Sequence, residues 1–384
     1  MKKLGTLLVL VTSLAVLTVT YSGHEMPIYP SYYPQEIRIE PVDSQAAGQL
    51  LLAGKIHAYV GDEPTFVATV PKSIGYAKSL GSYVVLTLNR SSALIRNRDS
   101  RCDMLHTLVQ ALSGAKEEDF VFHPYPVSPF HADYLHHADL ADAAKKRYLE
   151  RTADAGAGIP AGLKVRAKGA IATKLVAPHW SQGTTQWDAS VEEINVAGLV
   201  VSQLYHTNGW LGPPWVKQGW FHAYLLLRPV LRDATARQRA DAYASRLRTG
   251  DYENMEEKFN LERELVSLLT RDCQRAVLGH TLKREYFNTD FSAGIENIAF
   301  DSITGFNSPI FIRTVKLKDF PWNGWLRLGV STKPSAAWNP MAGLTDEAGR
   351  LIWFALGDPA VFPEPYDTSW TINRIGDVQS SIGQ

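Results

Sequence analysis

The sequence predicts an α/β protein with a β-rich C-terminal part, and three observations lead to this fold class. Strand and helix patterns alternate over residues 37–60, a glycine-rich stretch lies near the middle at 156–162, and the last third carries the turn signals of paired strands. At 384 residues the chain is long enough for two domains and a large core. We place these domains at 24–155 and 163–384.

The first domain opens with a compact strand–helix–strand unit. Residues 36–40 alternate polar and apolar side chains, as a half-buried strand does. Asp43 or Ser44 can cap a helix that Gly54 ends, and 56–60 follows as a second strand. The other elements that we expect in this domain are strands at 83–88 and 119–123 and helices at 103–112 and 129–151.

The second domain begins after the 156–162 stretch and becomes rich in strand signals towards its end. Asn323-Gly324 between apolar runs predicts a hairpin, and the polar segment 345–350 before an apolar run predicts a second one. The other elements that we expect are strands at 163–176 and 224–229 and helices at 191–204, 235–249 and 255–278.

The N-terminal segment 1–23 predicts export. Lys2 and Lys3 precede an apolar run at 4–21 that holds no charge, which is the pattern of a secretion signal. About eighteen apolar residues lie near the lower limit for spanning a bilayer. A cleaved signal peptide and an uncleaved signal anchor therefore both stay open. In either case the chain from His24 onward is expected in the periplasm or another extracytoplasmic space, with membrane contact through 4–21.

Composition and missing motifs exclude several function classes. Lys plus Arg equals Asp plus Glu, 39 each, so the chain lacks the basic excess of a nucleic-acid or lipid-surface binder. The sequence has no nucleophile elbow, phosphate-binding loop or c-type haem motif. Cys102 and Cys273 are the two cysteines, and two interpretations stay open: a disulfide between the halves, or two buried thiols.

The opening of the first domain resembles periplasmic solute-binding proteins of the two-lobed, type 2 kind. The residues that carry the resemblance are 37–40, the helix end at 49–55 and the strand and turn at 56–62, although His57 stands where Asp is commoner. The resemblance implies a two-lobed, mixed-sheet architecture that hinges at 156–162, with a ligand in the cleft at the strand ends. The ligand-binding residues that it suggests are Tyr59, Asp62, Glu63 and Thr65. The alternative is an ordinary capping turn.

A tryptophan-rich loop at 208–220 gives a second set of candidate ligand-binding residues. Trp210, Trp215 and Trp220 stand beside glycines and prolines, and an exposed indole there suits stacking on a sugar, an aromatic ring or a cation. Packing in a loop-rich core and a protein interface are the alternatives.

The segment 123–137 holds four of the eleven histidines and gives a candidate metal site. His131, Asp133, His136 and His137 fall at helical spacing if a helix begins at Pro129. Imidazole and carboxylate groups are the ligands that a zinc or copper ion requires. The alternative is a solvated helix face.

Together these patterns predict an exported ligand-binding protein without catalytic activity, which binds a small-molecule ligand or a membrane protein complex. Two alternatives stay open: a metal-dependent periplasmic enzyme built on the histidine cluster, and a membrane-anchored accessory subunit of a respiratory or secretion complex. No nucleic-acid partner is expected.

Overall fold

The computed structural model describes most of the chain between residues 34 and 373. The described residues are 34–67, 69–94, 97–150, 159–160, 162–178, 180, 186–201, 213–290, 294–319, 324–334, 344, 346–357 and 359–373. The predicted leader lies outside them. Within these ranges, no helix combines the length and the apolar character that a membrane crossing requires.

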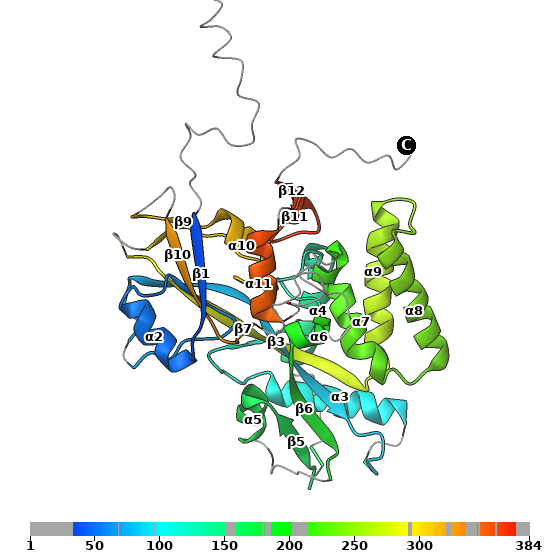
Figure 1. Cartoon of the computed structure of the whole chain (residues 1–384). Coiled ribbons are helices and arrows are strands. Elements are labelled where there is room, and N and C mark those ends of the chain that lie inside the picture. Colours follow the sequence, from blue (N-terminus) through cyan, green and yellow to red (C-terminus); the bar gives the residue numbers. More distant parts are fainter. Residues whose placement is uncertain are drawn as a thin grey trace, which may run out of the picture.

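The centre of the structure is an eight-stranded mixed sheet in the order β1-β10-β2-β7-β3-β6-β5, with β4 beside β7 (Figure 1). Its strands are β1 (Glu36–Pro41), β2 (Ala58–Val60), β3 (Ile74–Leu88), β4 (Phe120–Phe122), β5 (Val165–Lys168), β6 (Ala189–Asn195), β7 (Arg275–Asn288) and β10 (Trp325–Val330). Pairing is parallel for β1–β10, β10–β2 and β5–β6 and antiparallel for the rest. The predicted mixed α/β class is therefore confirmed.

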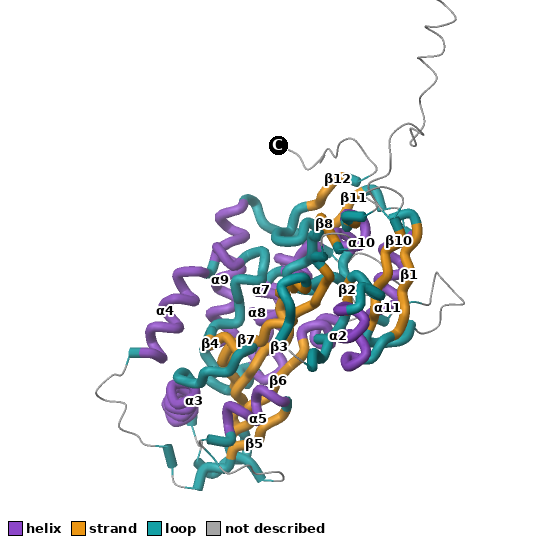
Figure 2. The backbone as a smooth tube through the Cα atoms, turned by 90° about the vertical axis from the view of Figure 1, so that its left-hand side faces the viewer, coloured by secondary structure: helices purple, strands orange, loops and turns teal. Residues whose placement is uncertain are grey.

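Helices cover both faces of this sheet (Figure 2). They are α2 (Ser44–Leu52), α3 (Arg98–Leu112), α4 (Ala138–Leu149), α5 (Ala170–Val176), α6 (Val196–Val201), α7 (Gly219–Leu227), α8 (Ala234–Thr249), α9 (Met255–Thr270), α10 (Pro309–Thr314) and α11 (Glu347–Leu356). Two small sheets, β8 (Ile295–Asn297) with β9 (Lys316–Leu317) and β11 (Val361–Pro363) with β12 (Trp370–Ile372), lie outside the large one.

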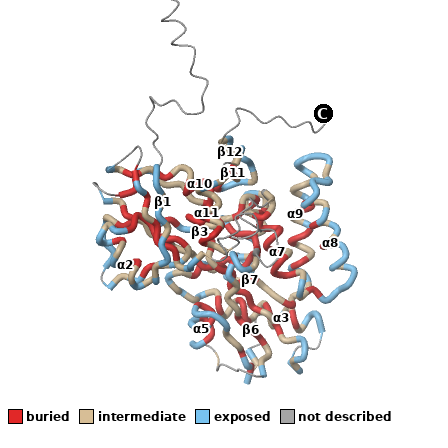
Figure 3. The backbone as a smooth tube through the Cα atoms, viewed as in Figure 1, coloured by how far each residue is buried: buried red, intermediate tan, exposed pale blue. Residues whose placement is uncertain are grey.

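The long strand β3 organises two of the hydrophobic clusters, because successive side chains of a strand point to opposite faces. Tyr83 and Val85 pack with α7, α8 and α9, whereas Val84 and Leu86 pack with α3 and α5 on the other face. A third cluster, around Phe306, joins β2 and β10 to α10 and α11. Figure 3 shows the result as buried central strands with exposed outer helices.

The proposed domain division at 156–162 remains a prediction. Residues 151–158 and 161 lie outside the described part. Strands from both sides of the division interleave: β10 lies between β1 and β2, and β7 lies between β2 and β3.

Two predicted β elements are wrong, and two other predicted elements are wrong in part: 170–176 of the expected strand at 163–176 is the helix α5, and 191–195 of the expected helix at 191–204 belongs to the strand β6. The expected strand at 224–229 begins inside helix α7, because its uninterrupted apolar run suits a buried helix as well as a buried strand. The expected hairpin at 345–354 is the helix α11, which starts where the Asp346 carboxylate accepts a hydrogen bond from the backbone of Gly349 at 2.9 Å. Asn323 lies outside the described residues, and the strand after it, β10, pairs in parallel with both neighbours.

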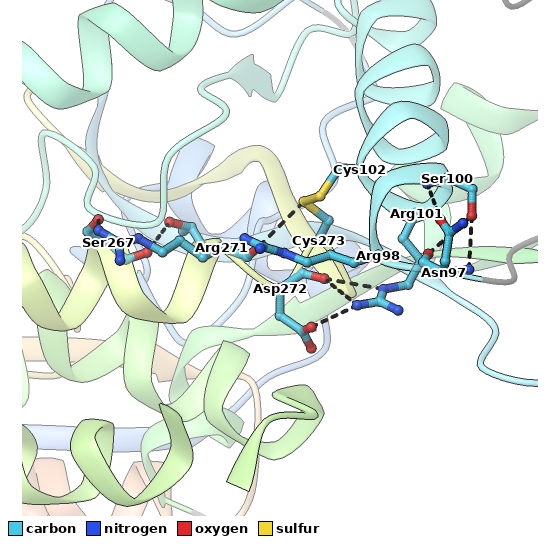
Figure 4. Close-up of a disulfide and its surroundings, with 10 residues drawn as sticks. Asn97, Arg98, Ser100, Arg101, Cys102, Ser267, Arg271, Asp272 and Cys273 are labelled. Carbon is cyan, nitrogen blue, oxygen red and sulfur yellow. Dashed lines mark hydrogen bonds and ion pairs between the residues drawn. A yellow bond between two sulfur atoms is a disulfide. The ribbon is translucent and has the colours of Figure 1, made fainter. Parts of the chain in front are cut away.

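Cys102 and Cys273 form a disulfide, which decides between the two interpretations of the cysteines. Their Cα atoms lie 5.0 Å apart although 171 residues separate them in sequence. The bond joins α3 to the segment just before β7 (Figure 4). Beside it, Arg101 makes an ion pair with Asp272 at 2.9 Å and also donates to the Asp272 carbonyl oxygen.

Candidate functional site

A cavity of about 160 Å³ lies against the middle of the large sheet. Its walls come from the end of β2, the central part of β3 and β7, the start of α6, the turn before α7, the segment 301–309, α11, and the β11–β12 connection (Figure 1). These segments span most of the described chain. Only the tertiary arrangement brings them to one place.

A break in the strand pairing opens the sheet at this cavity. The register between β3 and β7 shifts between Leu80 and Tyr83, and Leu80 and Gly81 line the cavity. A Cβ atom at Gly81 would lie 2.7 Å from the Thr281 hydroxyl, which itself accepts a hydrogen bond from the Ser82 backbone at 2.8 Å. The irregularity thus requires glycine, and such bulges commonly re-aim side chains at binding sites.

One wall carries an ammonium group held between two acids. Lys283 Nζ lies 3.2 Å from the Glu285 carboxylate and 3.5 Å from that of Glu347. Burial by itself lowers the pKa of Lys283, but these two carboxylates raise it above the ordinary value, so the ammonium stays charged. Glu285 is fixed in turn, because its two oxygens accept hydrogen bonds from the backbones of Gly61 at 2.9 Å and Phe306 at 2.6 Å.

The lining also carries a second pair of opposite charges. Lys217 forms an ion pair with Asp301 and donates to the carbonyl oxygen of Glu364. Asp301 also accepts hydrogen bonds from the backbones of Ile303 at 2.9 Å and Thr304 at 3.0 Å, which fixes the turn around it. The cavity therefore presents both signs of charge on held side chains.

Asn307 adds a buried acceptor that lacks a hydrogen bond within the described residues. Its Oδ1 atom has no partner there, whereas its Nδ2 donates to the Glu347 carbonyl oxygen at 2.8 Å. The side chain is only 5% exposed. A buried polar atom without a partner costs free energy, and a ligand with a donor group would remove that cost.

The structure brings only one residue of the predicted turn, Gly61, to this cavity. Tyr59 is buried and donates to the Val42 carbonyl oxygen at 3.0 Å. Asp62 is exposed and accepts from the Glu63 backbone at 2.8 Å, and Glu63 itself accepts from the Arg284 backbone at 3.0 Å. The exposed Thr65 lies outside the cavity wall as well.

The tryptophan candidates are spread over different environments. Trp210 lies outside the described residues. Trp215 is half-buried and packs edge-on against Phe221, with ring centroids 4.7 Å apart. The expectation that Trp220 is exposed is wrong: it is fully buried in the core, and its indole nitrogen donates to the Gln218 side chain. The helix α7 turns this side chain inward, so core packing outweighs ligand stacking at this position.

The histidine-rich segment divides between two clusters. Inside the core, His131 Nε2 lies 2.7 Å from the Tyr83 hydroxyl and 3.2 Å from His222 Nδ1. Asp133 and His137 instead approach Glu262 of α9, and His136 lies 2.9 Å from the same glutamate. The predicted helix from Pro129 forms as a short 3-10 turn at Tyr134–His136 followed by α4.

The residues that line the cavity with polar groups were missed by the sequence analysis. Lys283, Asn307 and Glu347 stand singly in unrelated segments, without a motif around them. No local signal distinguishes them from surface residues, and only the order of the strands joins them.

Comparison with known proteins gives matches at the level of structure. No family model and no curated protein matches the chain. One similar structure is the oligopeptide-binding protein AppA from Bacillus subtilis in complex with a nonapeptide, with a TM-score of 0.39 and 13% identity over 72% of this chain and 58% of that one. Another is Haemophilus influenzae OppA in complex with a peptide, with a TM-score of 0.40 and 9% identity over 72% and 56%. A third is the ABC transporter-associated periplasmic binding protein DppA from Helicobacter pylori with a bound peptide. Its TM-score is 0.39, and its identity is 11% over 72% of this chain and 55% of that one.

The chain thus spans between 55% and 58% of the length of these three structures.

Proposed function

We propose that this protein binds a small polar solute outside the cytoplasm and performs no chemistry on it. The observation that carries the proposal is the cavity with its held polar groups, above all the Lys283 ammonium and the unsatisfied Asn307 oxygen. Small-molecule sites commonly combine apolar walls with a few fixed polar groups of this kind.

The cavity indicates the chemistry of the solute. Ammonium and carboxylate groups lie on its walls together with the apolar side chains of Leu80, Val200 and Ile303. A volume of about 160 Å³ suits a molecule of roughly the size of benzene. We expect the ligand to carry at least one donor, which would face Asn307, one anionic or acceptor group, which would face Lys283, and an apolar part.

Two observations support a location outside the cytoplasm. The uncharged apolar run at 4–21 after Lys2 and Lys3 has the pattern of an export signal, through which the protein would contact the membrane. The Cys102–Cys273 disulfide is of a kind that persists in oxidising compartments and is rare in the cytosol.

Native mass spectrometry of the protein taken from its own extracytoplasmic fraction would test the proposal. We expect a co-purified small molecule at one copy per chain. Its dissociation constant, measured by calorimetry, should rise about tenfold to a hundredfold in Lys283→Met and in Asn307→Ala, since a charge-assisted or buried hydrogen bond is lost.

Lys78→Met is the matched control, because Lys78 is an exposed lysine of β3 away from the cavity. This variant should bind as the native protein does. The proposed site would be contradicted if the native protein carried no small molecule. It would also be contradicted if the native protein and the variants Lys283→Met, Asn307→Ala and Lys78→Met all bound the solute equally well. Turnover of the solute would contradict the absence of catalysis.

A further inference from the structure

A second buried cluster lies away from the cavity, where the turn before α4 meets the helix α9. Asp133 and His137 stand at the two ends of the 3-10 turn Tyr134–His136, and Glu262 comes from α9. One ligand-type atom from each of the three side chains lies within 4.8 Å of the others. All three side chains are at most 1% exposed.

Two atoms in this cluster lack a hydrogen-bond partner within the described residues. They are His137 Nε2 and Glu262 Oε1, and both belong to fully buried side chains. His137 Nε2 lies 3.8 Å from the Asp133 carboxylate, which is too long for a hydrogen bond. Buried polar groups are almost always satisfied, so two such atoms within one cluster of metal-ligand side chains indicate a site that can bind a ligand.

The other polar atoms of the same side chains are held by neighbours. His137 Nδ1 lies 2.9 Å from the Tyr125 hydroxyl, and Glu262 Oε2 lies 2.9 Å from His136 Nδ1. Metal-binding histidines and carboxylates are commonly oriented in this way, with one atom held by a neighbour and the other free to bind.

The negative charges of the cluster also favour a bound cation. The Asp133 carboxylate accepts hydrogen bonds from the Gly219 and Trp220 backbones at 2.6 Å and 3.1 Å, and Lys258 approaches Glu262 at 3.7 Å. A cation bound between the two buried carboxylates would offset the cost of burying their charges.

We propose that Asp133, His137 and Glu262 bind a divalent transition metal ion, with Zn²⁺ as the best match. One imidazole nitrogen and two carboxylate oxygens form a ligand set that zinc accepts readily, whereas the absence of sulfur from the set disfavours Cu⁺. The ion would tie the turn before α4 to α9, across more than 120 residues of sequence, and thereby stabilise the core in which α7 also packs.

This proposal changes the ligand set expected from sequence. His131 lies in the separate cluster with Tyr83 and His222, and His136 orients Glu262 rather than joining the set. Glu262 replaces them, and no sequence signal near Asp133 points to it because it lies on a distant helix.

The test uses the full mature chain without an affinity tag, stripped with EDTA and then dialysed against Zn²⁺. We expect one zinc ion per chain by plasma mass spectrometry, and an X-ray absorption spectrum with one imidazole and otherwise oxygen ligands. Zinc should also raise the melting temperature. A stripped chain that retains no zinc, or a spectrum with sulfur or several imidazoles, would overturn the proposal; both measurements use the native protein and do not depend on a variant folding.

Glu262→Gln and Glu264→Gln form a matched pair on one helix, since Glu264 is exposed. Zinc affinity should fall at least tenfold in E262Q and stay unchanged in E264Q. Equal affinities in the two variants would refute the assignment of Glu262. The site lies apart from the solute cavity, so Lys283→Met should keep its zinc, and the failure of one proposal leaves the other standing.

Discussion

Loss of the Cys102–Cys273 disulfide should destabilise the protein strongly, because the bond closes a long loop. For a separation of 171 residues, the loop-closure model gives about 5 kcal/mol of stabilisation through the unfolded state. Part of this is offset in the folded state, since Cys273 sits at a φ of 54°, in the left-handed region, which costs about 1 kcal/mol for a residue with a Cβ atom. We therefore expect the double variant Cys102→Ser/Cys273→Ser to lose about 3–4 kcal/mol.

The neighbouring contacts should not replace the covalent bond. Arg101 and Asp272, which flank the cysteines, keep their ion pair in the variant, but such a contact forms only in the folded state and leaves the unfolded chain unrestrained. The loss should thus appear mainly as a lower stability of an otherwise native structure.

Urea unfolding followed by tryptophan fluorescence measures this loss. With a slope of about 3 kcal/mol per molar, the midpoint should fall by on the order of 1 M. Reduction of the native protein with dithiothreitol should produce the same shift, and dithiothreitol should have no effect on the double variant. A loss below about 1 kcal/mol, or a reduced protein as stable as the oxidised one, would refute the reasoning from loop closure.

Three further predictions follow from buried groups. Burial, followed by the nearby charge of Arg327, lowers the pKa of His57 to about 4, and its Nδ1 accepts a hydrogen bond from the Arg327 backbone at 2.9 Å. Between pH 6.5 and 4 the unfolded chain binds a proton at this histidine that the folded chain does not, so the free energy of unfolding should fall as the pH drops through this range. Urea titrations of His57→Gln should show a shallower fall. Gly305→Ala should lower the free energy of unfolding by at least about 2 kcal/mol in the same assay, because φ at this position is +67° and the new Cβ atom would lie 1.8 Å from the Glu285 carboxylate. An unchanged unfolding midpoint would contradict this. Phe306→Ala should lower the unfolding free energy by about 3–5 kcal/mol, since the ring is fully buried among aromatic side chains, and Phe306→Leu should lose clearly less.

Local patterns predicted some of the local structure, above all the first helix and its ends. Asp43 caps α2 through a hydrogen bond to the Ala46 backbone at 2.8 Å, and Gly54 follows the helix at a φ of +63°. Both features depend on residues within one or two turns of each other, so the sequence carries the whole signal. The apolar run in α7 shows the limit of such prediction. A segment that is buried on all sides has no hydrophobic periodicity from which a helix could be told from a strand.

The candidate sites were predicted far less well, and the reason is geometric. Asp133 and His137 were found together because they stand four positions apart, whereas Glu262 was missed because it reaches them only through the packing of α9. Lys283 and Asn307 were missed for the same reason: each is unremarkable in its own segment, and a site assembled from several strands leaves no spacing to recognise.

The sequence by itself determined the α/β class and the capped helix after the first strand; its export segment stays a prediction, and of its cysteines it showed only that the two can bridge. The tertiary structure decided which distant residues meet: β10 between β1 and β2, Cys102 at Cys273, Glu262 at His137, and Lys283 facing the cavity. Helix caps and turns form between residues that are close in sequence, so they leave a recognisable pattern. Long-range contacts depend on the order of the strands and on which faces are buried. Many different local sequences are compatible with the same strand order, so no local pattern reveals it.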